Sequence, residues 1–192
     1  MIVLVILGFG LTLAVNKITN KSGELRAVLR KTVVLSRELH TRAKLNGVTY
    51  RLVIDLGEGG PHSHQKLYVE KGSDASVITE DSSEENLHPA DSRDKEEAKT
   101  KSAFVEDNDL LKEPIEIPPE VYIAQVELNR VEKPVTRGLA YIHYLPQGLV
   151  EEAAIHLQRV EGEQRWTISI APLTGRAEVV SPSMTLKELK SQ

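Results

Sequence analysis

Few residues of this 192-residue chain have a type and spacing that could do chemistry. His62 and His64 place two imidazoles two positions apart in a turn, where they could hold a metal ion, but no further ligand accompanies them. His88, His143 and His156 are scattered along the chain. There is no cysteine, so disulfides, thiolate zinc sites and cysteine nucleophiles are excluded. We therefore expect no metal and no cofactor.

Motifs for phosphate binding and nucleophilic catalysis are equally absent from the sequence. The glycine-rich residues 57–60 lack the Lys-Ser/Thr pair and the following helix of a phosphate-binding loop. The chain carries 24 Lys and Arg residues against 28 Asp and Glu residues, and this net charge of -4 gives no argument for a nucleic-acid partner. We expect a protein that is not an enzyme and has no small-molecule substrate. Its function is therefore sought in the helices and strands that the sequence predicts.

The first element is an apolar segment, residues 1–16, which contains no charged residue. As a helix it would be about 24 Å long, slightly shorter than the roughly 30 Å core of a bilayer. A secretory signal peptide would begin with positive charge, and none precedes the apolar run. Apolar residues occupy every face, which is too apolar for a surface helix and leaves a buried core helix as the other alternative. We predict that residues 1–16 form the transmembrane part of a helix.

The second element, residues 17–46, has the pattern of an amphipathic helix. Apolar residues recur at spacings of three and four, and the Asn-Gly pair at positions 46–47 favours a helix end. Eight Lys or Arg residues and two Glu residues between positions 17 and 44 form a face that is either solvated or directed to lipid headgroups or acidic partners. On the opposite, apolar face we predict helix–sheet packing by Leu25, Val28, Leu35 and Leu39.

The rest of the chain contains strands and one acidic stretch. Alternating apolar residues predict a first β-hairpin in residues 47–70 and a run of C-terminal β-strands in residues 121–182, followed by a tail at 183–192. Residues 71–120 between them are predicted to be a disordered acidic insertion, because positions 74 to 120 hold 15 acidic and 5 basic residues. Short ordered pieces around Phe104-Val105 and Leu110-Leu111 stay open as an alternative within it. The predicted fold class is α+β, with one long N-terminal helix packed on an antiparallel β-sheet domain.

Two parts of the sequence also resemble a known family. The segment MIVLVILGFGLTLAV is similar to the inner part of the N-terminal helix of type IV pilins and type II secretion pseudopilins. Residues 144–148 (Tyr-Leu-Pro-Gln-Gly) and 174–176 (Thr-Gly-Arg) resemble turns of the GspH/FimT-type minor pseudopilins. The resemblance implies a pilin-like fold whose membrane and fibre-packing residues are Ile2, Val3, Leu4, Val5, Ile6, Leu7, Leu11, Leu13 and Val15.

The function that this resemblance implies is structural. A minor pseudopilin is a subunit of the periplasm-spanning pseudopilus of a type II protein secretion system. Such a subunit would cross the bacterial inner membrane once and place its β domain in the periplasm. It would contact other pseudopilins or pilins through its N-terminal helix, and also the inner-membrane assembly platform. The resemblance further implies that the natural polypeptide begins upstream of Met1 and is cut by a prepilin peptidase.

Two alternatives of different kinds stay open at this point. The chain could be a FimT-like minor pilin that acts in pilus assembly or DNA uptake, or a membrane-anchored β domain that binds a partner. The basic residues that follow the apolar segment would normally keep that side cytoplasmic, so charge alone leaves the membrane orientation open.

Overall fold

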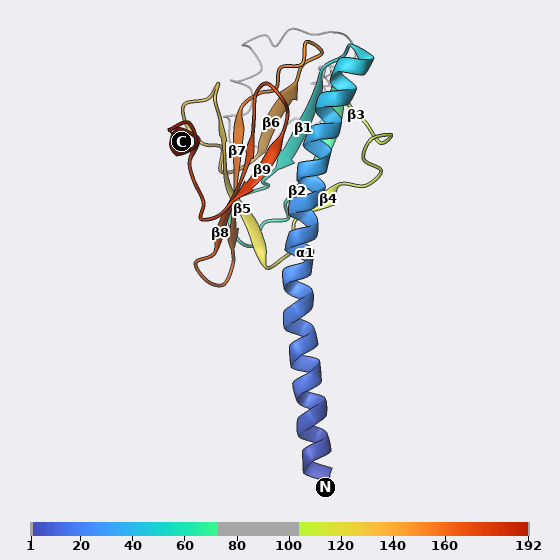
Figure 1. Cartoon of the computed structure of the whole chain (residues 1–192), viewed down its shortest axis with the longest axis vertical. Helices are drawn as coiled ribbons and strands as arrows, with labels where there is room; N and C mark the ends of the chain where they lie inside the picture. The colour runs from blue at the N-terminus through green and yellow to red at the C-terminus, as the bar shows by residue number, and fades with distance from the viewer. Residues whose placement is uncertain (1, 73–103, 192) are drawn as a thin grey trace, which may run out of the picture.

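The computed structural model describes residues 2–72 and 104–191, except that the side chains of residues 2–22 and of Glu24 are not described. These residues build one long N-terminal helix, two antiparallel sheets and a short C-terminal helix (Figure 1). The observed class is therefore α+β with antiparallel sheets, as the sequence predicts.

The long helix α1 runs without a break over Ile2–Asn46, which is about 67 Å at the rise of an α-helix. One half lies against the sheets and the N-terminal half projects away from them (Figure 1). The helix ends where the sequence predicts, because Gly47 adopts φ 66°, the left-handed conformation that terminates a helix. The four residues predicted for helix–sheet packing are all buried: Leu25, Val28, Leu35 and Leu39.

Within the described residues, nine strands form the two sheets. The first sheet contains β1 (Tyr50–Asp55), β2 (Lys66–Gly72), β3 (Phe104–Glu106), β4 (Ile115–Glu116) and β6 (Leu139–Tyr144). In it, β1 pairs with β2 and β6, and β3 and β4 pair with opposite ends of β2. The second sheet has the order β5-β7-β8-β9, formed by Val121–Leu128, Ala153–Arg159, Arg165–Ile170 and Ala177–Val180. The helix α2 (Leu186–Leu189) follows β9.

The position of β6 divides the predicted run of C-terminal strands between two sheets. Instead of pairing with β5, β6 pairs with β1, so that Tyr144 lies opposite Tyr50 and Ile142 opposite Leu52. All four of these side chains are buried. Because alternate residues of a strand face the same side, β1 and β6 together cover one side of the core with these residues. The second sheet and α1 enclose the rest of the core.

The prediction of disorder over residues 71–120 is wrong at both of its ends. Strand β2 continues to Gly72, and the chain from position 104 to 120 forms β3, β4 and ordered turns. The Phe104 ring lies against the guanidinium of Arg51, 4.1 Å from ring centroid to Cζ, and Ile115 is buried. Composition alone predicts disorder there, but one aromatic and one aliphatic anchor are enough to hold short edge strands in an acidic stretch. Strand β3 lies at Phe104-Val105, one of the two places where the sequence left an ordered piece open. Residues 73–103 lie outside the described residues.

Candidate functional site where the helix meets the two sheets

Two turns of the β domain meet α1 at one place, which we call the helix seat (Ser36, His40, Tyr144, Gly148 and Gly175). His40 contacts both turns, since its Nε2 lies 3.0 Å from the carbonyl oxygen of Gly148 and its Cβ borders Gly175. A Cβ atom added to Gly175 would lie only 2.5 Å from the Cβ of His40. Glycine is therefore required there for the turn to approach the helix this closely. These are the two turns whose sequences resemble those of the minor pseudopilins.

A buried hydrogen-bond chain connects α1 to both sheets at the helix seat. The Ser36 hydroxyl donates to the carbonyl oxygen of Gly175 at 2.7 Å and lies 2.9 Å from the Tyr144 hydroxyl. Because the single Ser36 proton goes to Gly175, Tyr144 must be the donor in the second bond. Burial raises the pKa of Tyr144 above its usual range, and the hydrogen bond with Ser36 opposes this in part, so the phenol stays protonated and can donate.

The helix seat fixes the position of α1 relative to both sheets. Tyr144 is the last residue of β6 in the first sheet, and Gly175 lies two residues before β9 in the second. Ser36 on the helix therefore forms hydrogen bonds with a strand of the first sheet and with the turn that leads into β9 of the second sheet. The three- and four-residue periodicity did not identify Ser36, because that pattern is recognised from apolar residues and serine is polar. The only available signal was a small polar residue directly beside the buried Leu35.

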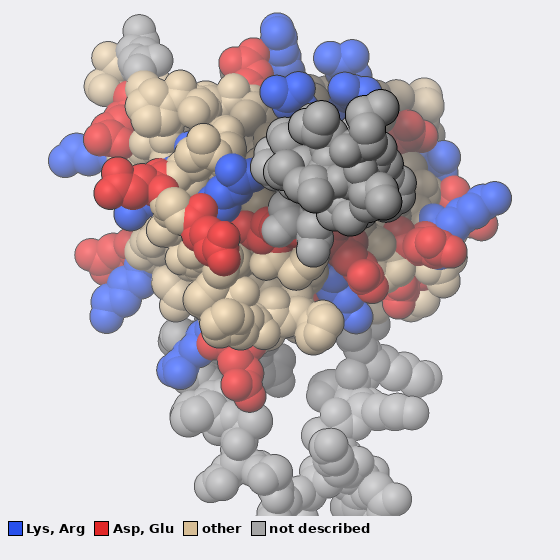
Figure 2. All heavy atoms as spheres, turned by 90° about the horizontal axis from the view of Figure 1, so that it is seen from below, with Lys and Arg blue, Asp and Glu red and all other residues tan. Residues whose placement is uncertain are grey.

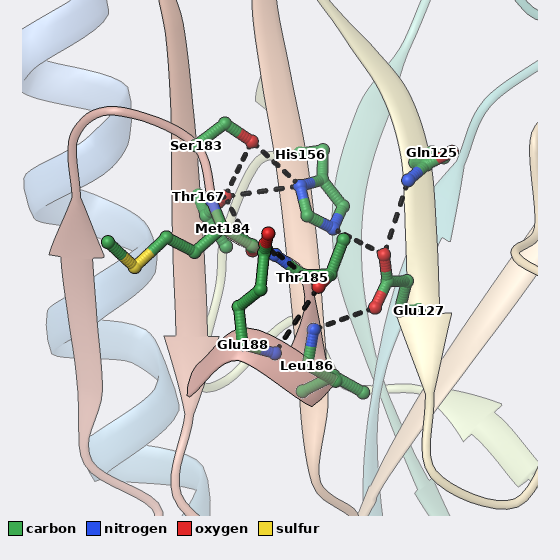
Figure 3. A network of polar contacts seen from close by, with 9 residues as sticks. All are labelled: Gln125, Glu127, His156, Thr167, Ser183, Met184, Thr185, Leu186 and Glu188. Carbon is green, nitrogen blue, oxygen red and sulfur yellow. Dashed lines mark hydrogen bonds and ion pairs between the residues drawn. The ribbon is translucent and has the colours of Figure 1, made fainter. Parts of the chain in front are cut away.

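A second polar network lies on the second sheet, around His156 of β7 (Figure 3). His156 Nδ1 lies 3.0 Å from Ser183 Oγ and 3.1 Å from Thr167 Oγ1, and Nε2 lies 3.1 Å from Glu127 Oε1. Burial lowers the pKa of His156, while the carboxylates of Glu127 and Glu188 act in the opposite direction. The direction of the shift favours a neutral imidazole that accepts hydrogen bonds at one nitrogen.

The His156 network holds the C-terminal segment across the sheet. Thr167 Oγ1 accepts a 3.0 Å hydrogen bond from the Met184 amide, and Glu127 Oε2 accepts a 2.8 Å hydrogen bond from the Leu186 amide (Figure 3). A hydroxyl, an imidazole and a carboxylate in a row are also the components of a nucleophilic triad. Here, however, the two neighbouring amides that could stabilise an oxyanion already donate within the network. The arrangement therefore attaches the tail to the second sheet.

The remaining sequence candidates do not meet at a common site. His62 and His64 are exposed, and His143 Nδ1 lies 2.9 Å from Glu151 Oε2. His88 is outside the described residues. Within residues 2–72 and 104–191, no group of three or more His, Asp or Glu side chains is placed to hold a metal ion. A polar cleft of about 600 Å³ beside the His156 network is lined by side chains that include Gln125, Glu163, Arg165 and Thr185.

The predicted membrane and fibre-packing residues, from Ile2 to Val15, all belong to α1, but their side chains are not among those described. Among the described residues, no helix is both long enough and apolar enough to span a bilayer. No protein-family model, curated protein or solved structure matches the chain.

Proposed function

We propose that the chain is a minor pseudopilin, a structural subunit of the pseudopilus of a type II protein secretion system. The observation that carries this proposal is the form of α1: one unbroken 45-residue helix, half packed on the β domain and half projecting from it (Figure 1). The projecting half contains the uncharged residues up to position 16. In this proposal the projecting half is held in the membrane and later packs beside the helices of other subunits, while the β domain covers the outside.

The helix seat supports the same proposal for a mechanical reason. A subunit that is lifted out of a membrane must transmit force between its helix and its outer domain without separating them. The Ser36 hydrogen-bond chain and the close contact of His40 with Gly175 join the helix to both sheets at one level. In this proposal the inner membrane holds the projecting half of α1, the β domain lies in the periplasm, and the assembly platform and other pseudopilins are the partners.

Replacement of the projecting half tests this function against a simple membrane anchor. In the bacterium that encodes the chain, the gene would be deleted and complemented with the natural gene or with a version whose residues 1–16 are replaced by an unrelated Leu/Ala membrane helix. A pseudopilin needs its own helix to pack in the fibre, so only the natural gene should restore the secretion of exported proteins. Restoration by both genes would contradict the proposal and favour a membrane-anchored binding module.

The same deletion strain separates secretion from pilus assembly. Exported proteins in the culture medium, surface pili and uptake of labelled DNA would be measured together. Loss of secretion with normal pili and DNA uptake is the result that the proposal expects. Loss of pili or of DNA uptake, with secretion intact, would assign the chain to the FimT-like minor pilins instead.

A further inference from the structure

The chain after β9 crosses the outer face of the second sheet as a segment that we call the C-terminal strap (residues 183–191). In β7, Ile155 and Leu157 belong to the core, so His156 between them points to the opposite, outer face. The strap passes over this face beside the ring (Figure 3). The side chain of His156 is only 8% exposed there. The strap therefore takes part in keeping this imidazole away from water.

Most of the contacts that hold the C-terminal strap on the sheet are polar. Two of its backbone amides donate to side chains of the sheet, and Lys190 Nζ lies 2.7 Å from Glu152 Oε2. Among the described residues of the strap, only Leu186 is buried, and the core contains no described residue after Ala177. Because little apolar surface holds it down, the strap can leave the sheet without opening the core.

A neutral imidazole joins the C-terminal strap to the sheet. His156 Nδ1 lies 3.0 Å from the Ser183 hydroxyl of the strap and 3.1 Å from the Thr167 hydroxyl of β8. A ring nitrogen without a proton accepts a hydrogen bond from a hydroxyl, whereas a protonated one only donates. Protonation of Nδ1 would therefore remove this acceptor and place a positive charge where little water reaches it.

Charged groups face the ring from several elements. Glu127 of β5 and Glu188 of α2 favour the protonated imidazole, but burial is the largest effect and lowers the pKa of His156. Strand β8 presents an uncharged hydroxyl to the ring, and the cleft beside it adds Glu163 and Arg165, whose charges are opposite. On the face shown in Figure 2, the described acidic and basic side chains are interspersed. The immediate neighbours of the ring therefore set its charge.

Attachment of the strap and protonation of the ring oppose each other. When the strap leaves the sheet, water reaches the ring, so burial no longer lowers the pKa of His156, while Glu127 still favours the charged form. Below the ordinary histidine pKa of 6.5, the released form therefore binds a proton that the attached form does not. Because one proton is involved, each pH unit raises the population of the released strap by about tenfold at most.

We propose that the C-terminal strap is a releasable element, which leaves the second sheet in mild acid while the rest of the β domain stays folded. His156 is the group whose protonation drives the release. Release uncovers the outer face of β7 and β8 and breaks the contact of Lys190 with Glu152. The contacts that carry this proposal all lie within the β domain, so it does not depend on the pseudopilin function proposed above.

Hydrogen exchange of the full-length chain in detergent tests the release. Protection factors, which are corrected for the effect of pH on intrinsic exchange, would be measured for the Met184 and Leu186 amides and for the amides of β8 between pH 7.5 and 5. The proposal expects the strap amides to be less protected than β8 at every pH, and their protection to fall by up to about tenfold per pH unit below 6.5. Protection equal to that of β8 would show that the strap opens only with the whole domain and would overturn the proposal, as would protection that does not change with pH.

Two histidine variants identify the group that titrates. His156→Gln should make the protection of the strap amides nearly independent of pH, because glutamine cannot bind the proton. His143→Gln is the matched control, since His143 is equally buried but lies in the first sheet beside Glu151. It should leave the pH dependence of the strap unchanged. A pH dependence that survives in His156→Gln would overturn the role of His156.

A direct titration keeps the proposal testable if His156→Gln does not fold. The pKa of His156 would be measured by NMR in the full-length chain and in a chain that ends at Pro182. The shortened chain keeps every described residue of the core, which ends at Ala177. The pKa should lie below 6.5 in the full-length chain and rise when the strap is removed, because burial is lost and Glu127 remains. The same pKa in both chains would show that the strap does not control the ring and would overturn the proposal.

Discussion

The Ser36 hydroxyl of α1 donates a 2.7 Å hydrogen bond to the carbonyl oxygen of Gly175, although the two residues are 139 positions apart in the sequence. Ser36 is fully buried, and its oxygen also receives the Tyr144 hydroxyl. A buried carbonyl and a buried phenol that lose their partner cannot turn to water. This one side chain therefore controls how firmly the helix is held on the β domain.

Replacing Ser36 by alanine should destabilise the fold by about 1–3 kcal/mol, the cost of leaving buried polar groups unsatisfied. Urea unfolding of the full-length chain in detergent, followed by tryptophan fluorescence, measures this change. Thr41→Ala is the matched control, because Thr41 is exposed and its hydroxyl bonds only within the helix, to Arg37. A loss no larger than that of Thr41→Ala would contradict the proposed role of the helix seat.

Replacing Gly175 by alanine should be more costly, at about 2–5 kcal/mol, because two penalties combine. The residue has φ 60°, and the new Cβ would press against the Cβ of His40. Gly47→Ala isolates the first penalty, since Gly47 has φ 66° with nothing within 4 Å of a new Cβ. Equal unfolding free energies for the two variants would show that the turn does not need its close approach to α1.

Truncating Leu39 to alanine should destabilise the protein by about 2–5 kcal/mol, since its side chain is fully buried where α1 packs on the sheets. Leu35, at 6% exposure, should behave similarly. Val34→Ala on the same helix is the control, because Val34 is 58% exposed and its truncation should change stability by less than about 0.5 kcal/mol. Thermal unfolding of the three variants under one condition decides the prediction.

The lowered pKa of His156 predicts that stability decreases in mild acid. Above the ordinary histidine pKa of 6.5 the imidazole is neutral in both the folded and the unfolded state, so it contributes no pH dependence. As the pH falls below 6.5, the unfolded chain binds a proton that the folded protein does not, so the free energy of unfolding drops. His156→Gln should flatten this part of a stability profile measured between pH 7.5 and 5. An unchanged slope would show that other groups cause it.

The sequence by itself determined most of the elements of this protein. The three- and four-residue spacing predicted the packed half of α1 and its buried residues, because a helix that covers a sheet must be apolar on one face. Alternation predicted strands in residues 47–70 and 121–182, where β1, most of β2, and β5 to β9 are found, because a half-buried strand repeats every two residues.

Only the tertiary structure decided how these elements are partnered. Periodicity reports which face of an element is buried but not what covers it, so it could not show that β6 pairs with β1 and leaves β5 to the second sheet. Nor could it detect Ser36, because the hydrogen bonds of this side chain end on residues more than 100 positions away. Local pattern fixes local structure, whereas a site assembled from distant residues exists only after the chain has folded around its core.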